Sequence, residues 1–167
     1  MSELPIQRVN EDEVADFQIR MSIASRLDQV WQVRVAIAAI LREMQVADLD
    51  CLHVQLAVAE AINNIVEHGY GESGDGRIDI AAVTEQDKLR IEIMDDAPPL
   101  PLERLKHLLR EPLPEPSDAT PLLSSGRGLP IMRSTMDSVS FDRCGERNQL
   151  VLSKVLRRIF AQPNFPA

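Results

Sequence analysis

Four polar residues recur at helical spacing inside an apolar stretch of the chain. Residues 52–66 are mainly Leu, Val, Ile and Ala, which predicts a helix that is buried on most of its circumference. The polar residues fall at i, i+3, i+4 and i+7 and so share one narrow stripe: Glu60, Asn63, Asn64 and Glu67. A buried polar group without a partner costs about 1–3 kcal/mol. This stripe must therefore face water, a partner or a ligand.

The residue types in the stripe suit a site for a metal and a nucleotide. An asparagine carbonyl is a hard oxygen ligand for Mg²⁺, which takes few protein oxygens and completes its shell with phosphates and water. A nearby glutamate can orient or deprotonate a nucleophile. Glu60 is therefore a candidate base, and Asn63 or Asn64 a candidate metal ligand. A solvated helix face remains the alternative, because Glu and Asn four residues apart are usually no more than that.

A second candidate group follows an alternating, strand-like segment. Asp95 ends this segment and precedes Asp96-Ala97-Pro98-Pro99. A buried aspartate can accept a hydrogen bond from an exocyclic amine such as that of adenine. The same pattern also occurs where an aspartate simply terminates a strand before prolines.

The third candidate group is Gly126-Arg127-Gly128 at a predicted helix start. Two glycines there would present bare backbone N–H groups to phosphate, helped by the helix dipole. By itself a Gly-x-Gly marks a tight turn more often than a phosphate site, and Arg127 could be an ordinary surface residue. We expect His68 to be a residue at the helix end and not a metal ligand, because no second histidine lies at the spacing of a metal site.

The elements that must position these groups alternate between strand and helix patterns. Apolar residues at every second position predict strands, and apolar stripes with a period near 3.6 predict helices. The pattern predicts an α+β two-layer sandwich, with helices on one face of a mixed, mainly antiparallel sheet. The predicted strands are 17–23, 78–82, 89–93, 139–142 and 149–156, and the predicted helices are 27–45, 50–68, 102–110 and 126–136.

Several local features refine this prediction. Asp50 is the predicted N-cap of the second helix, and Gly69 its C-terminal glycine. On the helix 27–45, one apolar stripe fits the core. Trp31, Val35 and Ala38 form a second stripe, which suggests contact with another helix or a second chain.

Composition limits the classes of function. The chain has 167 residues and a net charge of −8, which argues against a nucleic-acid-binding surface. Its longest apolar run is too short to span a bilayer, and the first residues lack the pattern of a signal peptide. Cys51 and Cys144 show no metal spacing and suggest free thiols in a reducing, cytoplasmic compartment.

The domain boundaries follow from the same patterns. We expect a flexible lead at 1–15, one domain at 16–158 and a flexible tail at 159–167. Residues 111–125 hold four prolines among polar residues, and long loops of this kind are often lids over a site.

Three stretches resemble one known family of ATP-binding domains. "EAINNIVEHGY", "IEIMDDAPP" and "SSGRGLPIMRSTMDSVSF", with the later "NQLVLSK", look like the N, G1 and G2 boxes of the gyrase, histidine-kinase and mismatch-repair ATPase superfamily. Within this Bergerat-fold group, the chain is most similar to the bacterial anti-sigma factor serine kinases. The resemblance covers about residues 15–156.

The resemblance implies roles for particular residues. Glu60 matches the general base, and Asn64 matches the Mg²⁺ ligand, since its spacing from Glu60 and to the following His-Gly fits better than that of Asn63. Asp95 matches the residue that binds the adenine amine. The remaining residues expected to contact ATP are His68, Ala97, Gly126, Arg127, Gly128, Leu129 and Asn148. Ala97 and Pro99 occupy positions where the superfamily has glycines. The first of those glycines lets the backbone approach the base, and Ala97 adds a methyl group there, so this difference could change the affinity for nucleotide.

The resemblance also implies an activity and partners. The expected function is an ATP- and Mg²⁺-dependent kinase that phosphorylates a serine of a small anti-sigma factor antagonist. In the other state of this partner switch it holds a sigma factor, and a homodimer is expected. The alternatives are a nucleotide-dependent binding module without catalysis, which sequesters a regulatory partner, and an α+β domain that binds no nucleotide. Glu60 separates the first two, because a pure binder needs no base beside the metal.

Overall fold

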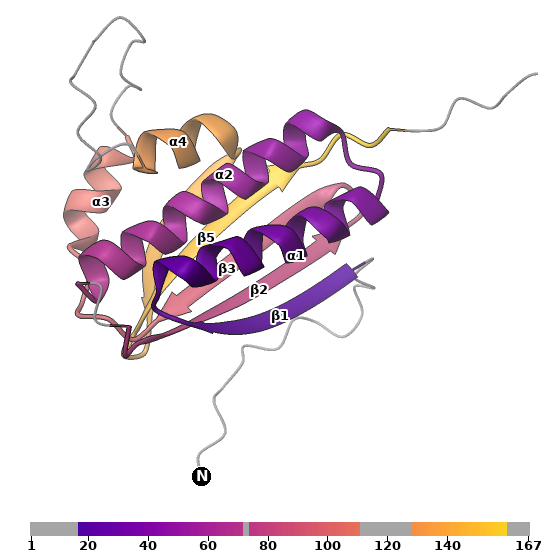
Figure 1. The fold of residues 1–167 in the computed structure, drawn as a ribbon. Coiled ribbons are helices and arrows are strands. Elements are labelled where there is room, and N and C mark those ends of the chain that lie inside the picture. Colours follow the sequence, from indigo (N-terminus) through magenta and orange to yellow (C-terminus); the bar gives the residue numbers. More distant parts are fainter. Residues whose placement is uncertain (1–16, 72–73, 111–127, 160–167) are drawn as a thin grey trace, which may run out of the picture.

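A five-stranded sheet carries the helices of this chain on one of its faces (Figure 1). The computed structural model describes residues 17–71, 74–110 and 128–159. The strands lie in the order β1-β2-β3-β5-β4, and every pairing among them is antiparallel. Their bounds are β1 Phe17–Ala24, β2 Arg77–Glu85, β3 Lys88–Asp95, β4 Ser138–Cys144 and β5 Arg147–Val155. The predicted α+β sandwich with helices on one face of the sheet is confirmed, and the sheet, predicted to be mixed and mainly antiparallel, is antiparallel at every pairing of the described strands.

The helices lie side by side across the sheet. Their bounds are α1 Val30–Glu43, α2 Asp48–Asn64, α3 Leu102–Leu108 and α4 Gly128–Thr135. In Figure 1, α2 runs between α1 and α4, and it packs against both. A short 3-10 turn, Leu27–Gln29, leads into α1, and a π turn, Ile65–Gly69, extends α2.

Strict alternation along the strands builds the core. Ile80 of β2 stands opposite Ile93 of β3, and both side chains are almost fully buried beneath the helices. The intervening residues of these strands face away from the helices and are more polar. This period of two is the signal that predicted the central hairpin from sequence.

The prediction that Asp50 caps the second helix is wrong. Helix α2 begins at Asp48, with Ala47 in the N-cap position and no side-chain cap. Asp50 is the third residue of the helix, within its first turn, and is only 1% exposed. Its carboxylate accepts hydrogen bonds from the backbone N–H and the guanidinium of Arg157. A tertiary ion pair, which local spacing cannot show, takes the place of a cap.

The second apolar stripe of α1 also differs from its prediction. Ala38 is buried, at 6% exposure, because it faces the interior with the core stripe. The exposed apolar residues are Leu27 at 44%, Trp31 at 66% and Val35 at 45%. They are spaced by four residues and therefore form one stripe on the solvent side of α1 and of the 3-10 turn before it, which holds Leu27.

The last two strands are longer than predicted. The segment 143–147 was expected to form their turn, but only Gly145 and Glu146 lie between β4 and β5. Gly145 has φ of 62°, a left-handed conformation that glycine adopts without steric cost. A two-residue turn of this kind suits a tight antiparallel hairpin.

The described residues hold no helix that is long and apolar enough to cross a membrane. Within them, Cys51 is buried, Cys144 is exposed, and both thiols are free. The predicted lead at 1–15, the predicted lid at 111–125 and the tail from residue 160 onward lie outside the described residues.

Candidate nucleotide-binding site

The polar stripe of α2 faces the start of α4. Asn64 is half-buried, and a Cβ built on Gly128 would lie 2.6 Å from its Nδ2 atom. No side chain larger than hydrogen fits at that position without displacing Asn64. The Asn64 amide has no hydrogen-bond partner among the described residues. The structure therefore brings two of the predicted site residues together and leaves the amide oxygen of Asn64 available.

Glu60 lies one helical turn before Asn64 on the same stripe. Its carboxylate is half-buried and makes no ion pair or hydrogen bond within the described part of the chain. Burial raises the pKa of this carboxyl, and the negative charge of Glu67 raises the pKa further. A carboxylate in such a place is disposed to accept a proton. Its position costs stability, so packing alone does not explain it.

Asp95 ends β3 at the edge of the helix layer and is only 3% exposed. Its Oδ1 atom accepts two hydrogen bonds, from the Ala97 backbone N–H at 2.9 Å and from Asn148 Nδ2 at 2.8 Å. Among the described residues, no donor reaches the other oxygen, Oδ2. That oxygen can therefore accept a hydrogen bond from an amine of a ligand.

The π turn at the end of α2 joins the two parts of the site. A Cβ built on Gly69 would lie 2.9 Å from the Cβ of Ala97, so the turn packs directly on the loop after Asp95. Only glycine permits this approach, and π turns inside helices are often found at functional sites. The same turn leaves His68 exposed to solvent.

Two residues that sequence reasoning did not assign support this loop. The Tyr70 hydroxyl accepts a hydrogen bond from the Asp96 backbone N–H at 2.9 Å and donates one to the Arg77 carbonyl at 3.2 Å. Arg147 Nε pairs with Asp96 Oδ1 at 2.6 Å, and its Nη2 pairs with Asp79 Oδ2 at 2.8 Å. The "HGY" segment pointed to Tyr70. No sequence signal pointed to Arg147, because its partners lie on other strands.

The remaining predicted residues fall into three groups. Leu129 is the second residue of α4 and packs, partly buried, against the core. Asn148 is buried behind Asp95 and touches it directly. Gly126 and Arg127 lie outside the described residues.

The donor set fits an adenine nucleotide with Mg²⁺. Within the described ranges there is no group of three His, Cys, Asp or Glu side chains that could enclose a metal by itself. Mg²⁺ does not need such a group, since it binds with one or two protein oxygens plus phosphates. Asn64 offers an oxygen without a partner among the described residues, and the glycine at 128 lets the start of α4 approach it closely. The buried Asp95 suits the amine of the base.

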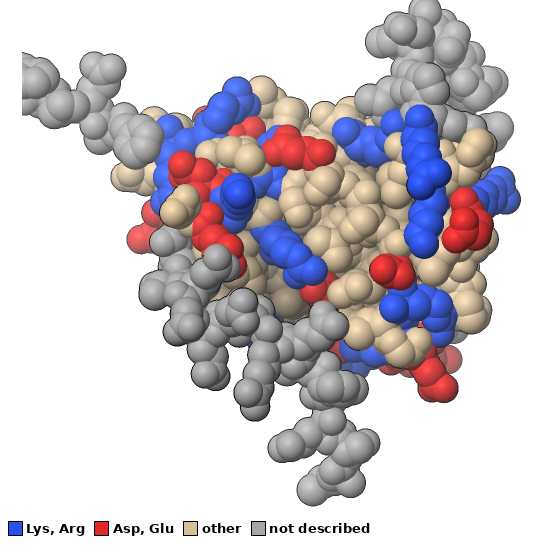
Figure 2. Space-filling model, turned by 180° about the vertical axis from the view of Figure 1, so that it is seen from behind, with Lys and Arg blue, Asp and Glu red and all other residues tan. Residues whose placement is uncertain are grey.

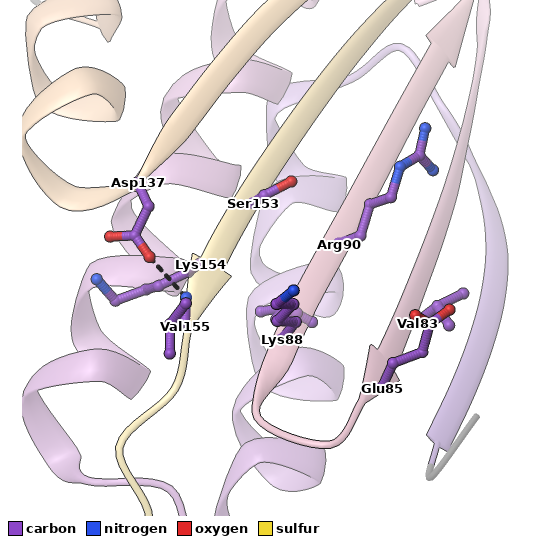
Figure 3. A pocket seen from close by; sticks show the side chains of 9 residues that line it. Val83, Glu85, Lys88, Arg90, Asp137, Ser153, Lys154 and Val155 are labelled. Atoms are coloured by element: carbon purple, nitrogen blue, oxygen red, sulfur yellow. Dashed lines mark hydrogen bonds between the residues drawn. The ribbon is translucent and has the colours of Figure 1, made fainter. Parts of the chain in front are cut away.

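The uncovered face of the sheet has a different character. Figure 2 shows it from behind, with Lys and Arg side chains around an uncharged centre. A hollow of about 280 Å³ lies on this face beside Lys88, Ser153 and Val155 (Figure 3). It opens at the start of β3, the opposite end of that strand from Asp95. Two of its polar residues are already bonded: Asp137 accepts from the Val155 N–H at 2.6 Å, and Lys154 Nζ donates to the Thr135 carbonyl.

The fold and the site define a class of protein, and comparison with known families agrees. The family described as "Histidine kinase-like ATPase domain" matches residues 23–154, and the chain belongs to it. Within that family it belongs to the anti-sigma factor branch. It is 31% identical over 114 residues to an anti-sigma F factor of Bacillus licheniformis, a match that covers 68% of this chain and 74% of the relative.

A further relative supports this placement, and a solved structure supports the fold. An anti-sigma F factor of Clostridium acetobutylicum is 31% identical over 122 residues, which cover 72% of this chain and 81% of that protein. The crystal structure of the RsbU and RsbW domains of a Mycobacterium tuberculosis protein matches with a TM-score of 0.59 and 17% identity. That match covers 85% of this chain and 32% of the longer one, and at this identity it supports the fold alone.

Proposed function

We propose that the protein is an ATP- and Mg²⁺-dependent serine kinase and anti-sigma factor of a partner-switching pathway. One observation carries the proposal: the half-buried Glu60 carboxylate has no partner among the described residues and lies one turn from Asn64, which faces Gly128. A structural glutamate in that position would be expected to form an ion pair. The names of the anti-sigma F factor relatives support the regulatory half of the proposal.

Each residue has a distinct task in this proposal. Asp95 accepts a hydrogen bond from the adenine amine through Oδ2. The Asn64 oxygen would hold Mg²⁺, and the ion would supply positive charge against the phosphates. The start of α4 at Gly128 receives the phosphates, because backbone N–H groups and the helix dipole favour anions there. Glu60 accepts the proton that the attacking serine hydroxyl loses.

The proposed partners follow from the branch to which the chain belongs. The protein substrate is a serine of a small anti-sigma factor antagonist, and the second partner is a sigma factor. We place this pathway in the cytoplasm and assign no nucleic-acid or membrane partner. The exposed stripe of Leu27, Trp31 and Val35, on α1 and the turn before it, supports a homodimer, since exposed apolar stripes on helices mark association surfaces.

The second candidate function is a binding module that uses nucleotide without catalysis. The same fold and the same adenine site would serve it, and only Glu60 separates the two. If the protein only binds partners, replacing Glu60 would leave its nucleotide and partner binding in place and there would be no phosphoryl transfer to lose.

The test is phosphoryl transfer by Glu60→Gln. Labelled γ-phosphate is followed from ATP to a cognate antagonist, and ATP affinity is measured by calorimetry. We expect transfer to fall by about 10²–10⁴, the usual contribution of a general base, with ATP affinity unchanged or slightly higher. Glu43→Gln, an exposed glutamate at the end of α1, is the control and should transfer phosphate normally. Full transfer by Glu60→Gln would refute the assignment of the base. Loss of ATP binding along with transfer would give Glu60 a structural role instead.

A further inference from the structure

Asn148 is the most extensively bonded side chain near the proposed adenine pocket. It lies on β5 directly opposite Asp95 in the strand register and is only 1% exposed. Its Nδ2 atom donates to Asp95 Oδ1 at 2.8 Å, to the Ala97 carbonyl at 3.1 Å and to the Pro98 carbonyl at 3.4 Å. Its Oδ1 atom accepts from the Leu100 N–H at 3.2 Å and from an arginine of β4 at 3.3 Å.

These contacts use all the hydrogen-bonding capacity of the Asn148 side-chain amide. An Asn side chain carries two N–H donors and an oxygen with two lone pairs. Three acceptors already share the two donors of Asn148, and two donors already reach its oxygen. The side chain therefore has no hydrogen-bonding capacity left for a nucleotide.

We propose that Asn148 is a positioning residue that shapes the adenine pocket through Asp95 without touching the base. This inference rests on the proposed function. The Asn148 amide and the Ala97 N–H both donate to Oδ1 of Asp95, which fixes the rotation of the carboxylate and reserves Oδ2 for the amine. A carboxylate free to rotate would discriminate less well between an amine and a carbonyl on the base.

The composition of the loop after Asp95 explains why the Asn148 side chain is needed to hold it. Pro98 and Pro99 have no backbone N–H, so this segment cannot continue a strand ladder after Asp95. The carbonyls of Ala97 and Pro98 then lack strand partners, and the Asn148 amide takes that place. One side chain of β5 thus holds the loop at three successive points between Ala97 and Leu100.

The neighbouring residue on β5 acts from the other face of the sheet. Arg147 is 16% exposed and pairs with Asp96 Oδ1, while the Met94 carbonyl accepts a further bond from it at 3.3 Å. The consecutive residues Arg147 and Asn148 therefore hold the consecutive residues Asp96 and Asp95. The end of β3 is constrained from both faces.

A double-mutant cycle with ADP tests the inference, because acting through Asp95 predicts that the two effects are not additive. ADP and GDP affinities are measured by calorimetry for the unaltered protein, Asn148→Ala, Asp95→Asn and the double variant. We expect Asn148→Ala to weaken ADP binding about tenfold, the effect of one lost charge-assisted hydrogen bond, and to reduce the preference for ADP over GDP. In the Asp95→Asn background, the same change should alter ADP affinity less than about twofold.

Controls separate positioning from folding. Gln149→Ala, the next residue on β5, should bind ADP normally. If Asn148→Ala shows no cooperative thermal unfolding, Asn148→Leu replaces it in the cycle, because a leucine fills a similar volume but has no donor for Asp95.

The outcomes are distinct. Additive losses in the double variant would mean direct contact with the base and would overturn the inference alone. Normal ADP affinity and base preference in the position-148 variant would also overturn it. Failure of the unaltered protein to bind ADP would overturn the proposed function together with this inference.

Discussion

Replacing Asp50 with asparagine should destabilise the fold by about 3 kcal/mol. Its carboxylate accepts three hydrogen bonds from Arg157, from the backbone N–H at 2.7 Å, Nε at 3.1 Å and Nη2 at 2.7 Å. Lys154 Nζ lies 3.8 Å away. Removing one member of a buried ion pair typically costs about 3–5 kcal/mol. Arg157 is 64% exposed, so water can solvate its charge after the substitution. Only Lys154, at 9% exposure, would keep a buried charge without its partner. The expected loss of stability is therefore at the low end of that range.

The melting temperature at pH 7 should therefore fall by about 6–12 °C, given about 2–4 °C per kcal/mol for a chain of this size. Asp48→Asn is the matched control: it lies in the same helical turn but is exposed, and it should change the melting temperature little.

The pH dependence gives a second check. The hydrogen bond from Arg157 lowers the pKa of Asp50 below its ordinary value. A group whose pKa is lowered in the folded state contributes stability above its unfolded pKa, near 3.9, and loses it as the pH falls through the folded value. Circular dichroism melts should show the difference between the unaltered protein and Asp50→Asn shrinking below about pH 4. Equal melting temperatures at pH 7, or a difference that stays constant down to pH 2, would refute the ion-pair account.

Three further predictions concern the proposed site and surface. Asp95→Asn should weaken ATP and ADP binding by the same factor, about tenfold or more, because recognition of the base does not involve the γ-phosphate; calorimetry that shows loss for ATP alone would contradict it. Gly128→Ala should weaken ATP binding more than adenosine binding, because its Cβ would lie 2.6 Å from Asn64 Nδ2; equal affinities with the unaltered protein would remove Gly128 from the site. Trp31→Lys should shift the sedimentation of a dimer toward that of a monomer, whereas Lys88→Glu on the other face of the sheet should not; an unchanged dimer would exclude the α1 stripe.

The fold could be predicted from sequence where the periodicity of apolar residues within one segment determines whether that segment is a strand or a helix. Alternation in β2 and β3 and the apolar run of α2 each depend on burial of one face, which the order of residues shows directly. The prediction failed where a distant residue decides. Asp50 looked like a cap because its partner Arg157 is 107 positions away in the chain. Ala38 looked exposed because a small residue fits either an interior or a surface position.

The candidate site divides in the same way. Glu60 and Asn64 share a stripe by helical geometry alone, so sequence could place them together. The contact between Asn64 and Gly128 depends on how α2 packs on α4, and only the motif resemblance anticipated it. The support of Asp95 by the start of β5 depends on the register of two strands that are joined through α3 and α4, which no local pattern reports.

The proposed site has a half for the base, at Asp95 and Asn148, and a half for the phosphates, at Glu60 and Asn64. The two halves differ in how many of their polar groups are hydrogen-bonded before any nucleotide binds. In the base half, Asp95 and Asn148 are buried and hydrogen-bonded to each other, so this half is rigid and adds to stability. In the phosphate half, Glu60 and Asn64 are half-buried without partners among the described residues, so this half costs stability until a ligand supplies them. Nucleotide binding should therefore gain its specificity for adenine from a preformed pocket. The response to phosphate should come from the contacts that Glu60 and Asn64 gain between α2 and α4, which is where the proposed kinase would use its free energy of binding.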